Sequence, residues 1–401
     1  MDWSRTKQGA LGVGHEICSY RAWIPQRLPE RLWVLHRFGF IIHPLDARRD
    51  IGRRYPIARY MPTAALEWAM TKKSAILVSE VRGIRSATGA QTSGFLVGCP
   101  LTPGQMLRLP TEFVYEKIVE AGRLAEERGA EVIGLGAFTA VVGDGGKTIA
   151  DRLTAAVTTG NSYTVAAAIE GALEGARLMG IDPSEAHVAV VGAGGSIGRT
   201  CAIVLADSVR EMTLVGLTLE EIEPVAGEIR ALGGCPVTCS SEIHAAIPKA
   251  DIIITVTSAG KAIIYPEDLK IGAVVCDVAR PRDVSVRVAQ ERDDVLVIEG
   301  GIIAVPGPDL DFGFNFGFPP RMAYACMSET ILLALEGRIE NYTIGKQVSV
   351  EQVREMSALA AKHGFKLAGF RSFEKEVTPE HIQKVREAAA TKRQRSSAAH
   401  V

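Results

Sequence analysis

Residues 187–206, HVAVVGAGGSIGRTCAIVLA, constrain the fold more than any other stretch of the chain. An apolar run enters a glycine turn of the form GxGxxxG, and residues with helical spacing follow the turn. Here Gly192 allows a tight turn, Gly194 lets the backbone approach a pyrophosphate, and Gly198 permits close helix packing. The helix N-terminus holds the anion. The stretch therefore predicts a strand, a turn and a helix that bind a dinucleotide.

Apolar strands alternate with helical patterns from His187 to Gly301. The strands are expected in the segments HVAVVGAGG, EMTLVGLT, ADIIITVTSA, GAVVCDVA and DVLVIEGG. Near-continuous apolar strands of this kind are typical of a parallel sheet that helices cover on both faces. We therefore predict an α/β protein whose central part is a Rossmann-type doubly wound parallel sheet.

The pattern divides the chain into three regions. Residues 1–160 mix strands and helices and are expected to form an N-terminal α/β substrate domain. An alanine-rich helix then opens the expected Rossmann domain, residues 161–305. Residues 306–401 are expected to form a C-terminal helical region that ends in a frayed basic tail, TKRQRSSAAHV.

Composition excludes several classes of function. Of the 401 residues 23% are charged, and the net charge of −1 gives no global attraction to nucleic acid. No run reaches the roughly 18 apolar residues of a spanning helix, so we expect no transmembrane segment and a cytoplasmic protein. Seven scattered cysteines argue against a disulfide framework. Cys235 and Cys239 lack the second pair of ligands that a tetrahedral zinc site needs, so no metal is expected.

The cofactor site is expected to extend from the glycine turn along the carboxyl edge of the sheet. Its expected residues come from the turn, from the end of the second strand and from a later loop: Gly192, Ala193, Gly194, Gly195, Ser196, Ile197, Gly198, Leu217, Thr218, Thr257, Ser258 and Ala259. An acidic residue about 20 positions after the glycines usually marks NAD, and a nearby arginine marks NADP. Leu217 and Thr218 are neither, so the residues leave both cofactors open.

Seven short blocks in one order carry a family resemblance. They are SATG (86–89), LGAFTAVV (135–142), TTGNSYT (158–164), GIDPSEAHVAVVGAGGSIG (180–198), EGG (299–301), ACMSETILLALEG (325–337) and HGF (363–365). With these blocks the chain resembles the cyanobacterial-type long-chain acyl-[acyl-carrier-protein] reductases over a stretch from about Phe38 to Phe365.

The resemblance implies an enzyme that reduces a long-chain fatty acyl thioester to a fatty aldehyde. Cys326, in the block ACMSE, matches the family's acyl-accepting cysteine. The implied cofactor is NADPH, and NADH stays open because the family usually has an arginine where Leu217 stands. The implied acyl donor is an acyl carrier protein or coenzyme A. The sequence leaves the oligomeric state open, with a homo-oligomer among the alternatives.

Cys326 would react as a thiolate, which a helix N-terminus favours by lowering the pKa of the thiol. Pro319 and Pro320 predict that a helix begins there, which places Cys326 in its second turn. Arg321 would add positive charge if it faced the thiol, and it is otherwise a solvated surface residue. Cys99 is the rival nucleophile, although its place at the end of an apolar strand favours a core position.

Two segments are candidates for contact with the substrate. Thr159, Gly160 and Asn161 begin the alanine-rich helix and either donate to an oxyanion or only cap the helix. Phenylalanines with alternate spacing would either line an acyl channel or fill a domain interface: Phe312, Phe314, Phe316 and Phe318, of which Phe314 and Phe316 are the expected substrate contacts.

The strongest local charge bias lies in the N-terminal region, within residues 48–59. It is an arginine cluster that either docks an acidic acyl carrier protein or forms a solvated face: Arg48, Arg49, Arg53, Arg54 and Arg59. Two other classes of function remain open from the sequence. One is a shikimate-dehydrogenase-like oxidoreductase that acts on a small polar substrate through lysine and aspartate, and the other is a non-catalytic nucleotide-sensing module.

Overall fold

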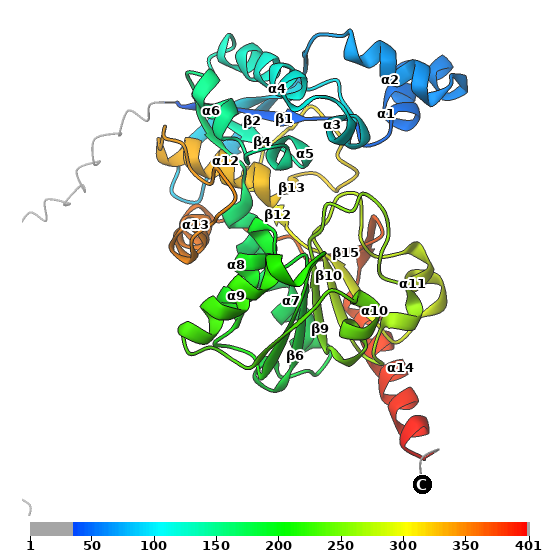
Figure 1. Ribbon diagram of the computed structural model, residues 1–401. Helices are drawn as coiled ribbons and strands as arrows, with labels where there is room; N and C mark the ends of the chain where they lie inside the picture. The colour runs from blue at the N-terminus through cyan, green and yellow to red at the C-terminus, as the bar shows by residue number, and fades with distance from the viewer. Residues whose placement is uncertain (1–34, 399–401) are drawn as a thin grey trace, which may run out of the picture. The chain divides into compact units, whose positions relative to one another are not determined.

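The computed structural model describes residues 35–398, which belong to one compact unit. Their strands form sheets of five, six, three and two strands, with helices packed against them (Figure 1). This architecture confirms the predicted α/β class. No helix within residues 35–398 has the length and apolar character that crossing a membrane requires.

The first sheet and its helices are built by residues 37–158. Their bounds are β1 (Arg37–Ile42), β2 (Ile76–Arg85), β3 (Gln91–Gly98), α3 (Pro103–Arg108), α4 (Thr111–Glu126), β4 (Val132–Leu135), α5 (Phe138–Val141), α6 (Lys147–Arg152) and β5 (Ala156–Thr158). The strand order is β2-β3-β1-β4-β5. All neighbours are parallel except β2 and β3, which pair antiparallel.

The two faces of the first sheet pack against different helices. Successive residues of a strand point to opposite faces. Ile41 of β1 therefore joins the core under α4, whereas Phe38 and Phe40 join the core under α12 (Ala325–Glu336). A helix from the C-terminal part of the chain thus completes the N-terminal sheet.

A helical excursion connects β1 to β2. It comprises α1 (Ala47–Arg54), η1 (Pro56–Tyr60) and α2 (Thr63–Thr71). These helices pack around a small apolar core of their own, formed by Ala47, Ala58, Leu66 and Met70. The side chains of Arg53 and Arg54, two members of the arginine cluster, lie outside the described part of the structure.

The second sheet is the predicted Rossmann sheet. Its strands are β6 (His187–Val191), β7 (Glu211–Val215), β8 (Val237–Ser240), β9 (Ile252–Thr255), β10 (Val274–Asp277) and β11 (Leu296–Glu299). Their spatial order is β11-β10-β9-β6-β7-β8, and every neighbouring pair is parallel. Counted from β6, this is the 3-2-1-4-5-6 order of dinucleotide-binding folds. β8 was not predicted, because its residues VTCS at the sheet edge lack an apolar run.

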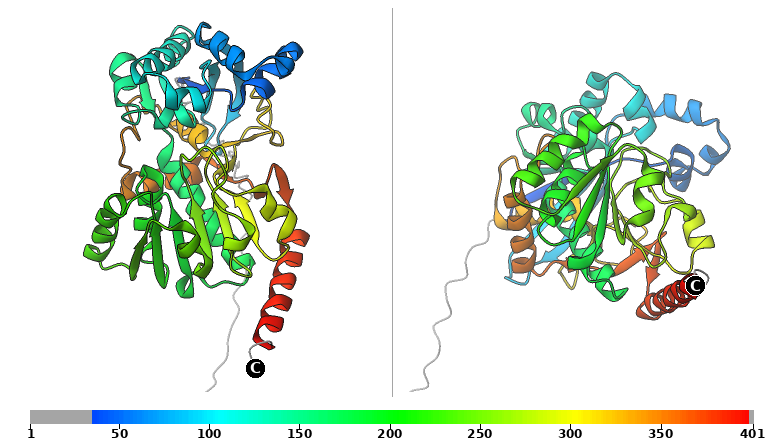
Figure 2. Two further views of the ribbon diagram at one scale, coloured as in Figure 1. Left: turned by 45° about the vertical axis from the view of Figure 1, so that its right-hand side comes forward. Right: turned by 60° about the horizontal axis from the view of Figure 1, so that its bottom comes forward.

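Helices cover both faces of the second sheet (Figure 2). Val188 and Val190 face one helical layer, and Ala189 and Val191 face the other. The first layer contains α7 (Asn161–Leu178), α8 (Ser196–Leu205) and α9 (Leu219–Ala231), and the second contains α10 (Ile243–Ala246), η3 (Ile247–Lys249) and α11 (Val286–Glu291). The single turns η2 (Pro183–Glu185) and η4 (Pro266–Asp268) lie in connecting loops.

The C-terminal part corrects two expectations. Its elements are β12 (Ile302–Ala304), β13 (Met322–Tyr324), α12, α13 (Val350–His363), β14 (Lys366–Leu367), β15 (Phe370–Ser372), β16 (Lys375–Val377) and α14 (Pro379–Ala398). The predicted helix start at Pro319 is wrong, because β13 pairs with β12 and the helix begins only at Ala325. Cys326 therefore lies in the first turn of α12, where a helix N-terminus acts most strongly on a thiol.

The prediction that residues 391–401 form a frayed tail is also wrong for the residues up to Ala398. α14 continues as a helix to Ala398 (Figure 2). Nearer its start it buries Ile382, Val385 and Ala389 against the core of the second sheet. Lys392 forms ion pairs with Asp293 and Asp294. The division at residues 160 and 305 stays a prediction.

Candidate active site

A cleft of about 2450 Å³ joins the carboxyl edges of the two large sheets. Its wall includes the glycine turn after β6, the loops after β9 and β10, the turn after β4 and the start of α12. The cleft also continues along apolar side chains of the helical excursion and of β2, namely Ile51, Leu66, Met70, Ile76 and Val78.

The glycine turn has the geometry of a pyrophosphate cradle. Gly192 has φ +87°, and the N–H groups of Gly192 and Ala193 both donate to the carbonyl of Val215. A Cβ on Gly198 would stand 2.2 Å from the Gly192 carbonyl oxygen, so only glycine permits this packing. α8 begins at Ser196, and the first N–H groups of a helix have no partner within it. These residues fit a dinucleotide.

Most of the expected cofactor residues line the cleft, but three do not. Gly192, Gly194, Gly195, Ser196, Ile197, Leu217, Thr257, Ser258 and Ala259 form part of its wall. Ala193 is fully buried in the core, Gly198 packs against Gly192, and Thr218 precedes α9 as its N-cap. Leu217 is 88% exposed, so its side chain is free to contact a bound cofactor or to face solvent.

A buried carboxylate orders the loop after β9. Asp283 is fully buried and accepts hydrogen bonds from the Thr255 hydroxyl at 2.6 Å, the Thr257 hydroxyl at 2.6 Å and the Thr257 N–H at 2.9 Å. The loop that carries Ser258 and Ala259 is therefore fixed at the cleft by a residue from the following loop.

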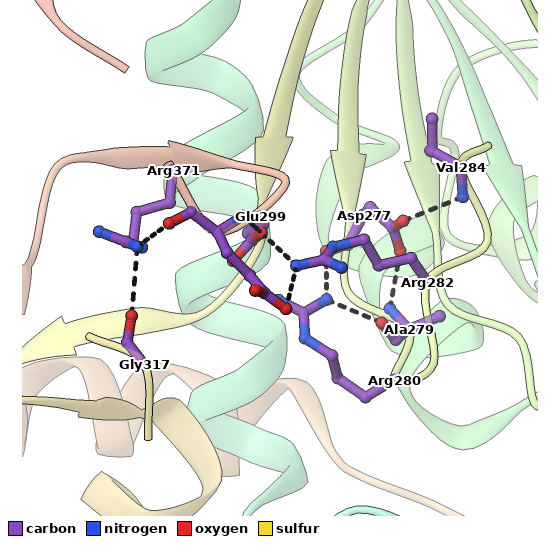
Figure 3. Close-up of polar contacts among 9 residues, drawn as sticks. Asp277, Ala279, Arg280, Arg282, Val284, Glu299, Gly317 and Arg371 are labelled. Carbon is purple, nitrogen blue, oxygen red and sulfur yellow. Dashed lines mark hydrogen bonds and ion pairs between the residues drawn. The ribbon is translucent and has the colours of Figure 1, made fainter. Parts of the chain in front are cut away.

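The loop after β10 places a cluster of charges beside the cleft (Figure 3). Glu299 accepts from Arg282 at 2.9 Å, from Arg280 at 3.3 Å and from the Glu374 N–H at 2.8 Å. Burial acts to raise the pKa of Glu299, but these arginines and the N–H group hold it below its ordinary value. Arg282 also pairs with Glu374 at 3.4 Å, and both Arg280 and Glu374 line the cleft.

Two further contacts fix this wall. Asp277 accepts from the N–H groups of Ala279 and Val284, and burial raises the pKa of its carboxyl to about 6 (Figure 3). The Arg280 guanidinium lies 5.8 Å from the ring centre of Tyr324, the residue that precedes α12.

Cys326 lies at the N-terminus of α12, beside the N-terminus of α7. It occupies the first turn of α12 and packs against Gly160, which precedes α7. Gly160 has φ +74°, and a Cβ there would stand 2.3 Å from both Cα and Cβ of Cys326. The Asn161 amide donates to the Ser196 hydroxyl at 3.0 Å, which ties α7 to the start of α8. The thiol and the glycine turn are thus connected through two adjacent residues.

The groups around the Cys326 thiol shift its pKa in opposite directions. Burial is the largest effect and raises the pKa of Cys326 to about 12. The Glu329 carboxylate raises it further, whereas the backbone N–H groups of Met327, Cys326 and Ala137 lower it. With a pKa of about 12 the thiol is protonated at neutral pH, although the three N–H groups act in favour of the thiolate.

This environment predicts how alkylation of Cys326 depends on pH. Only the thiolate reacts, and below the thiol pKa its fraction rises about tenfold per pH unit. The rate of carbamidomethylation at Cys326, followed by peptide mass spectrometry with iodoacetamide, is therefore expected to rise steadily from pH 7 to pH 10. A rate that levels off below pH 8 would contradict the raised pKa.

Glu329, one turn after Cys326, anchors α12. It is fully buried and accepts from the Thr158 hydroxyl at 2.5 Å, the Ser162 hydroxyl at 2.6 Å and the Tyr163 N–H at 2.9 Å, and also from the Thr343 hydroxyl. The donors Ser162 and Tyr163 belong to the first turn of α7, where a negative charge is favourable.

Removal of this anchor is expected to destabilise the fold. In Glu329→Leu the buried donors lose their acceptor, which costs about 3–5 kcal/mol of the free energy of unfolding. Urea denaturation measures the change, and Glu170→Leu, at an exposed position of α7, is the matched control. A loss below 1 kcal/mol in Glu329→Leu would contradict the anchoring role.

The expected substrate residues have mixed surroundings. The Thr159 hydroxyl donates to the Thr343 carbonyl, so it serves the fold in this state. Phe314 and Phe316 line the cleft with ring centres 4.8 Å apart, as an acyl channel would require. Phe312 is buried in the core of the first sheet. Phe318 packs on Tyr324 and lies under Arg371, as an interface residue would.

Cys99 also borders the cleft, but its surroundings differ from those of Cys326. Its exposed fraction is 0%, and burial raises the pKa of its thiol to about 12. Cys326 is half-buried and adjoins the N-terminus of α7. Within residues 35–398 no group of three or more His, Cys, Asp or Glu side chains is placed to hold a metal ion.

Sequence reasoning missed Glu329, Ala137 and His43, whereas Arg280 lies in the loop 277–281 that was expected at the carboxyl edge of the sheet. An acidic residue inside the apolar segment ACMSETILLALE was a usable signal for Glu329. Ala137 and His43 gave none, because an alanine and a lone histidine become informative only when β4 and β1 are placed side by side.

A protein family and several curated relatives match the chain. The sequence profile of the Shikimate / quinate 5-dehydrogenase family matches residues 175–299. "Aminotransferase PigE" of Serratia sp. is 31% identical over 86% of this chain, which spans only 41% of that protein. "Long-chain acyl-[acyl-carrier-protein] reductase" of Synechococcus elongatus is 26% identical over 82% of this chain and 98% of that protein. The sequence resemblance therefore holds as distant homology.

Solved structures of dehydrogenases are similar to parts of the chain. L-tryptophan dehydrogenase from Nostoc punctiforme has 11% identity and a TM-score of 0.38, with 89% of each chain covered. Quinate dehydrogenase from Corynebacterium glutamicum in complex with NAD has 15% identity and a TM-score of 0.33, with 62% of this chain and 81% of that chain covered. The family match and the Rossmann strand order together support NAD(P)-dependent oxidoreduction at the glycine turn.

Proposed function

We propose that the chain reduces a long-chain fatty acyl thioester to a fatty aldehyde, with NADPH as cofactor and Cys326 as the acyl acceptor; NADH remains an alternative. One observation carries the proposal. Cys326 borders the same cleft as the glycine turn and packs against Gly160, whose neighbour Asn161 donates to Ser196 of that turn. A thiol in this place can hold an acyl group next to a bound nicotinamide.

The chain's residues would divide the reaction into two steps. The Cys326 sulfur attacks the thioester carbonyl, a new C–S bond forms, and the bond to the carrier sulfur breaks, so the carrier leaves as its thiol. When bound, the reduced nicotinamide supplies the hydride that brings the acyl carbon to the aldehyde level. Cleavage of the Cys326 C–S bond then releases the aldehyde and a thiolate, which takes up a proton from solvent and returns to the thiol form.

The apolar part of the cleft supports a long-chain substrate. Its lining includes Phe314 and Phe316 on one side and side chains of the excursion, such as Leu66 and Met70, on another. A cleft of about 2450 Å³ exceeds the roughly 300–1,000 Å³ of ordinary small-molecule sites, so an acyl chain and a dinucleotide have room together.

A direct assay tests the proposed function. The purified chain is incubated with a long-chain acyl-carrier-protein or acyl-coenzyme A and NADPH. Oxidation of NADPH and formation of the matching aldehyde, identified by gas chromatography, are the expected result. Turnover of a small polar hydroxy acid with no turnover of any thioester would instead favour the shikimate-dehydrogenase-like alternative, whose family match ends at residue 299, before Cys326.

The arginine cluster leads to a prediction about the acyl donor. Arg48 and Arg59 are exposed on the excursion, and acyl carrier proteins are typically acidic. If these arginines steer the carrier, Arg48→Glu/Arg59→Glu should lower kcat/KM for the carrier substrate about tenfold at low salt and leave acyl-coenzyme A nearly unchanged.

A salt series separates docking from a general loss of activity. Screening acts over about 10 Å at 0.1 M ionic strength, so the difference between variant and wild type should shrink as salt rises. Arg354→Glu, at an exposed position of α13, is the control for charge reversal alone. Equal losses for both donors, or none, would refute docking through this cluster.

A further inference from the structure

The turn after β4 is strained beside the proposed nucleophile. Ala137 has φ +48° and ψ −120°, a conformation that residues with a side chain rarely adopt. Such strain persists only where the surroundings hold it, and it gathers at functional sites. Ala137 and Cys326 both border the cleft, and Gly134 of β4 packs against Thr330, one turn after Cys326 on α12, so the turn after β4 adjoins the start of that helix. The Ala137 N–H also acts to lower the pKa of the Cys326 thiol. The strained residue thus presents its N–H group to the sulfur.

His43 holds the next residue of this turn. The Phe138 N–H donates to Nε2 of His43 at 3.2 Å, and the two rings meet edge to face with centres 6.4 Å apart. The parallel register pairs Ile41 of β1 with Leu135 of β4, so His43 and Ala137, each two residues further along, leave the sheet as neighbours. The contact therefore follows directly from the topology of the first sheet.

The hydrogen bonds fix the tautomer of His43. A backbone N–H can only donate, so Nε2 must be unprotonated in order to accept from Phe138. Nδ1 then carries the hydrogen and donates to the Pro44 carbonyl at 3.1 Å. Burial favours this neutral form by lowering the pKa of His43, while Asp50 is the charged neighbour that acts in the opposite direction. At neutral pH the ring is an acceptor fixed in one orientation.

We infer that His43 is a positioning residue, which holds the turn of residues 136–138 so that the Ala137 N–H stabilises negative charge on the Cys326 sulfur. A catalytic effect of His43 depends on the proposed role of Cys326 as the acyl acceptor. Its effect on the thiol is measurable without a thioester or a nicotinamide, so the two proposals can fail separately.

Alkylation rates of Cys326 test the inference. In this reaction the sulfur loses its proton to solvent, forms a bond to the carbon of iodoacetamide and displaces iodide. His43→Leu removes the acceptor, and the rate at Cys326 at pH 8 is expected to fall about tenfold, as a rise of one pKa unit implies. His43→Gln offers a side-chain oxygen to the Phe138 N–H and is expected to stay within about threefold of the wild type.

Internal controls distinguish positioning from a loss of structure. Cys235 and Cys239 lie in the Rossmann half of the chain, so their alkylation rates and the affinity for NADPH should be unchanged in both variants. If His43→Leu does not fold, His43→Ala with free imidazole replaces it, and added imidazole is expected to restore the rate at Cys326. Equal rates in His43→Leu and wild type, equal losses in His43→Leu and His43→Gln, or no rescue by imidazole would overturn the inference.

Discussion

Replacement of Cys326 by alanine is expected to lower thioester reduction by at least about 10³-fold, because removal of a nucleophile leaves only binding and orientation to act on the substrate. The fold should tolerate the change, since the cysteine is half-buried at the start of α12 and Glu329 still anchors that helix. NADPH oxidation and aldehyde formation are the two readouts, and the affinity for NADPH should stay at the wild-type value.

Cys99→Ala is the matched variant for that experiment. Cys99 is fully buried at the end of β3, so its loss should affect stability slightly and leave most of the activity. Full activity in Cys326→Ala, or loss of activity in Cys99→Ala alone, would show that Cys326 is not the acyl acceptor.

Gly194→Val is expected to weaken nicotinamide dinucleotide binding about 100-fold, which corresponds to about 2.7 kcal/mol. A Cβ at this position would already stand 3.0 Å from the Cβ of Glu221, and the two further carbons of valine have to enter the cleft or displace α9. The backbone could then no longer approach a pyrophosphate. Fluorescence titration with NADPH and with NADH measures the effect without any turnover.

Gly227→Val is the control for this substitution. Gly227 lies on α9, and a Cβ there would meet nothing within 4 Å. Its cofactor affinity should equal that of the wild type. Unchanged affinity in Gly194→Val would show that the dinucleotide does not approach the turn as the strand order predicts.

The sheet that binds the cofactor could be predicted because its signals are local. Each of β6, β7, β9, β10 and β11 is an apolar run that ends at a glycine or polar loop, and the turn after β6 carries its own motif. β8 was not predicted, because a strand at the edge of a sheet needs no apolar run. Its residues, from Val237 to Ser240, are only partly buried.

The start of α12 could not be predicted from neighbouring residues. Pro319 and Pro320 satisfy the usual rules for a helix start, but Met322–Tyr324 form a strand with Ile302–Ala304. A partner about 20 residues away in the sequence thus overrode the local preference for a helix. The same long-range packing gives α14 its order, because the core of the second sheet covers Ile382 and Val385.

Only part of the candidate site could be predicted from the sequence. The glycine turn and Cys326 stand in recognisable motifs, whereas the groups that surround the thiol come from separate elements. Ala137 follows β4, His43 follows β1, and the hydroxyl donors to Glu329 come from residues near the start of α7 and from Thr343. No local pattern relates them, since they meet only when β1, β4, α7 and α12 pack together.

Intact mass spectrometry after incubation with a long-chain acyl thioester, in the absence of any nicotinamide, tests whether Cys326 accepts the acyl group. The wild type is expected to gain the mass of one acyl group, peptide mapping should place the group on Cys326, and NADPH should then remove it as aldehyde. Cys326→Ala should gain no such mass. An acyl adduct that persists in Cys326→Ala, or a wild type that turns over thioesters with no adduct on Cys326, would contradict the account.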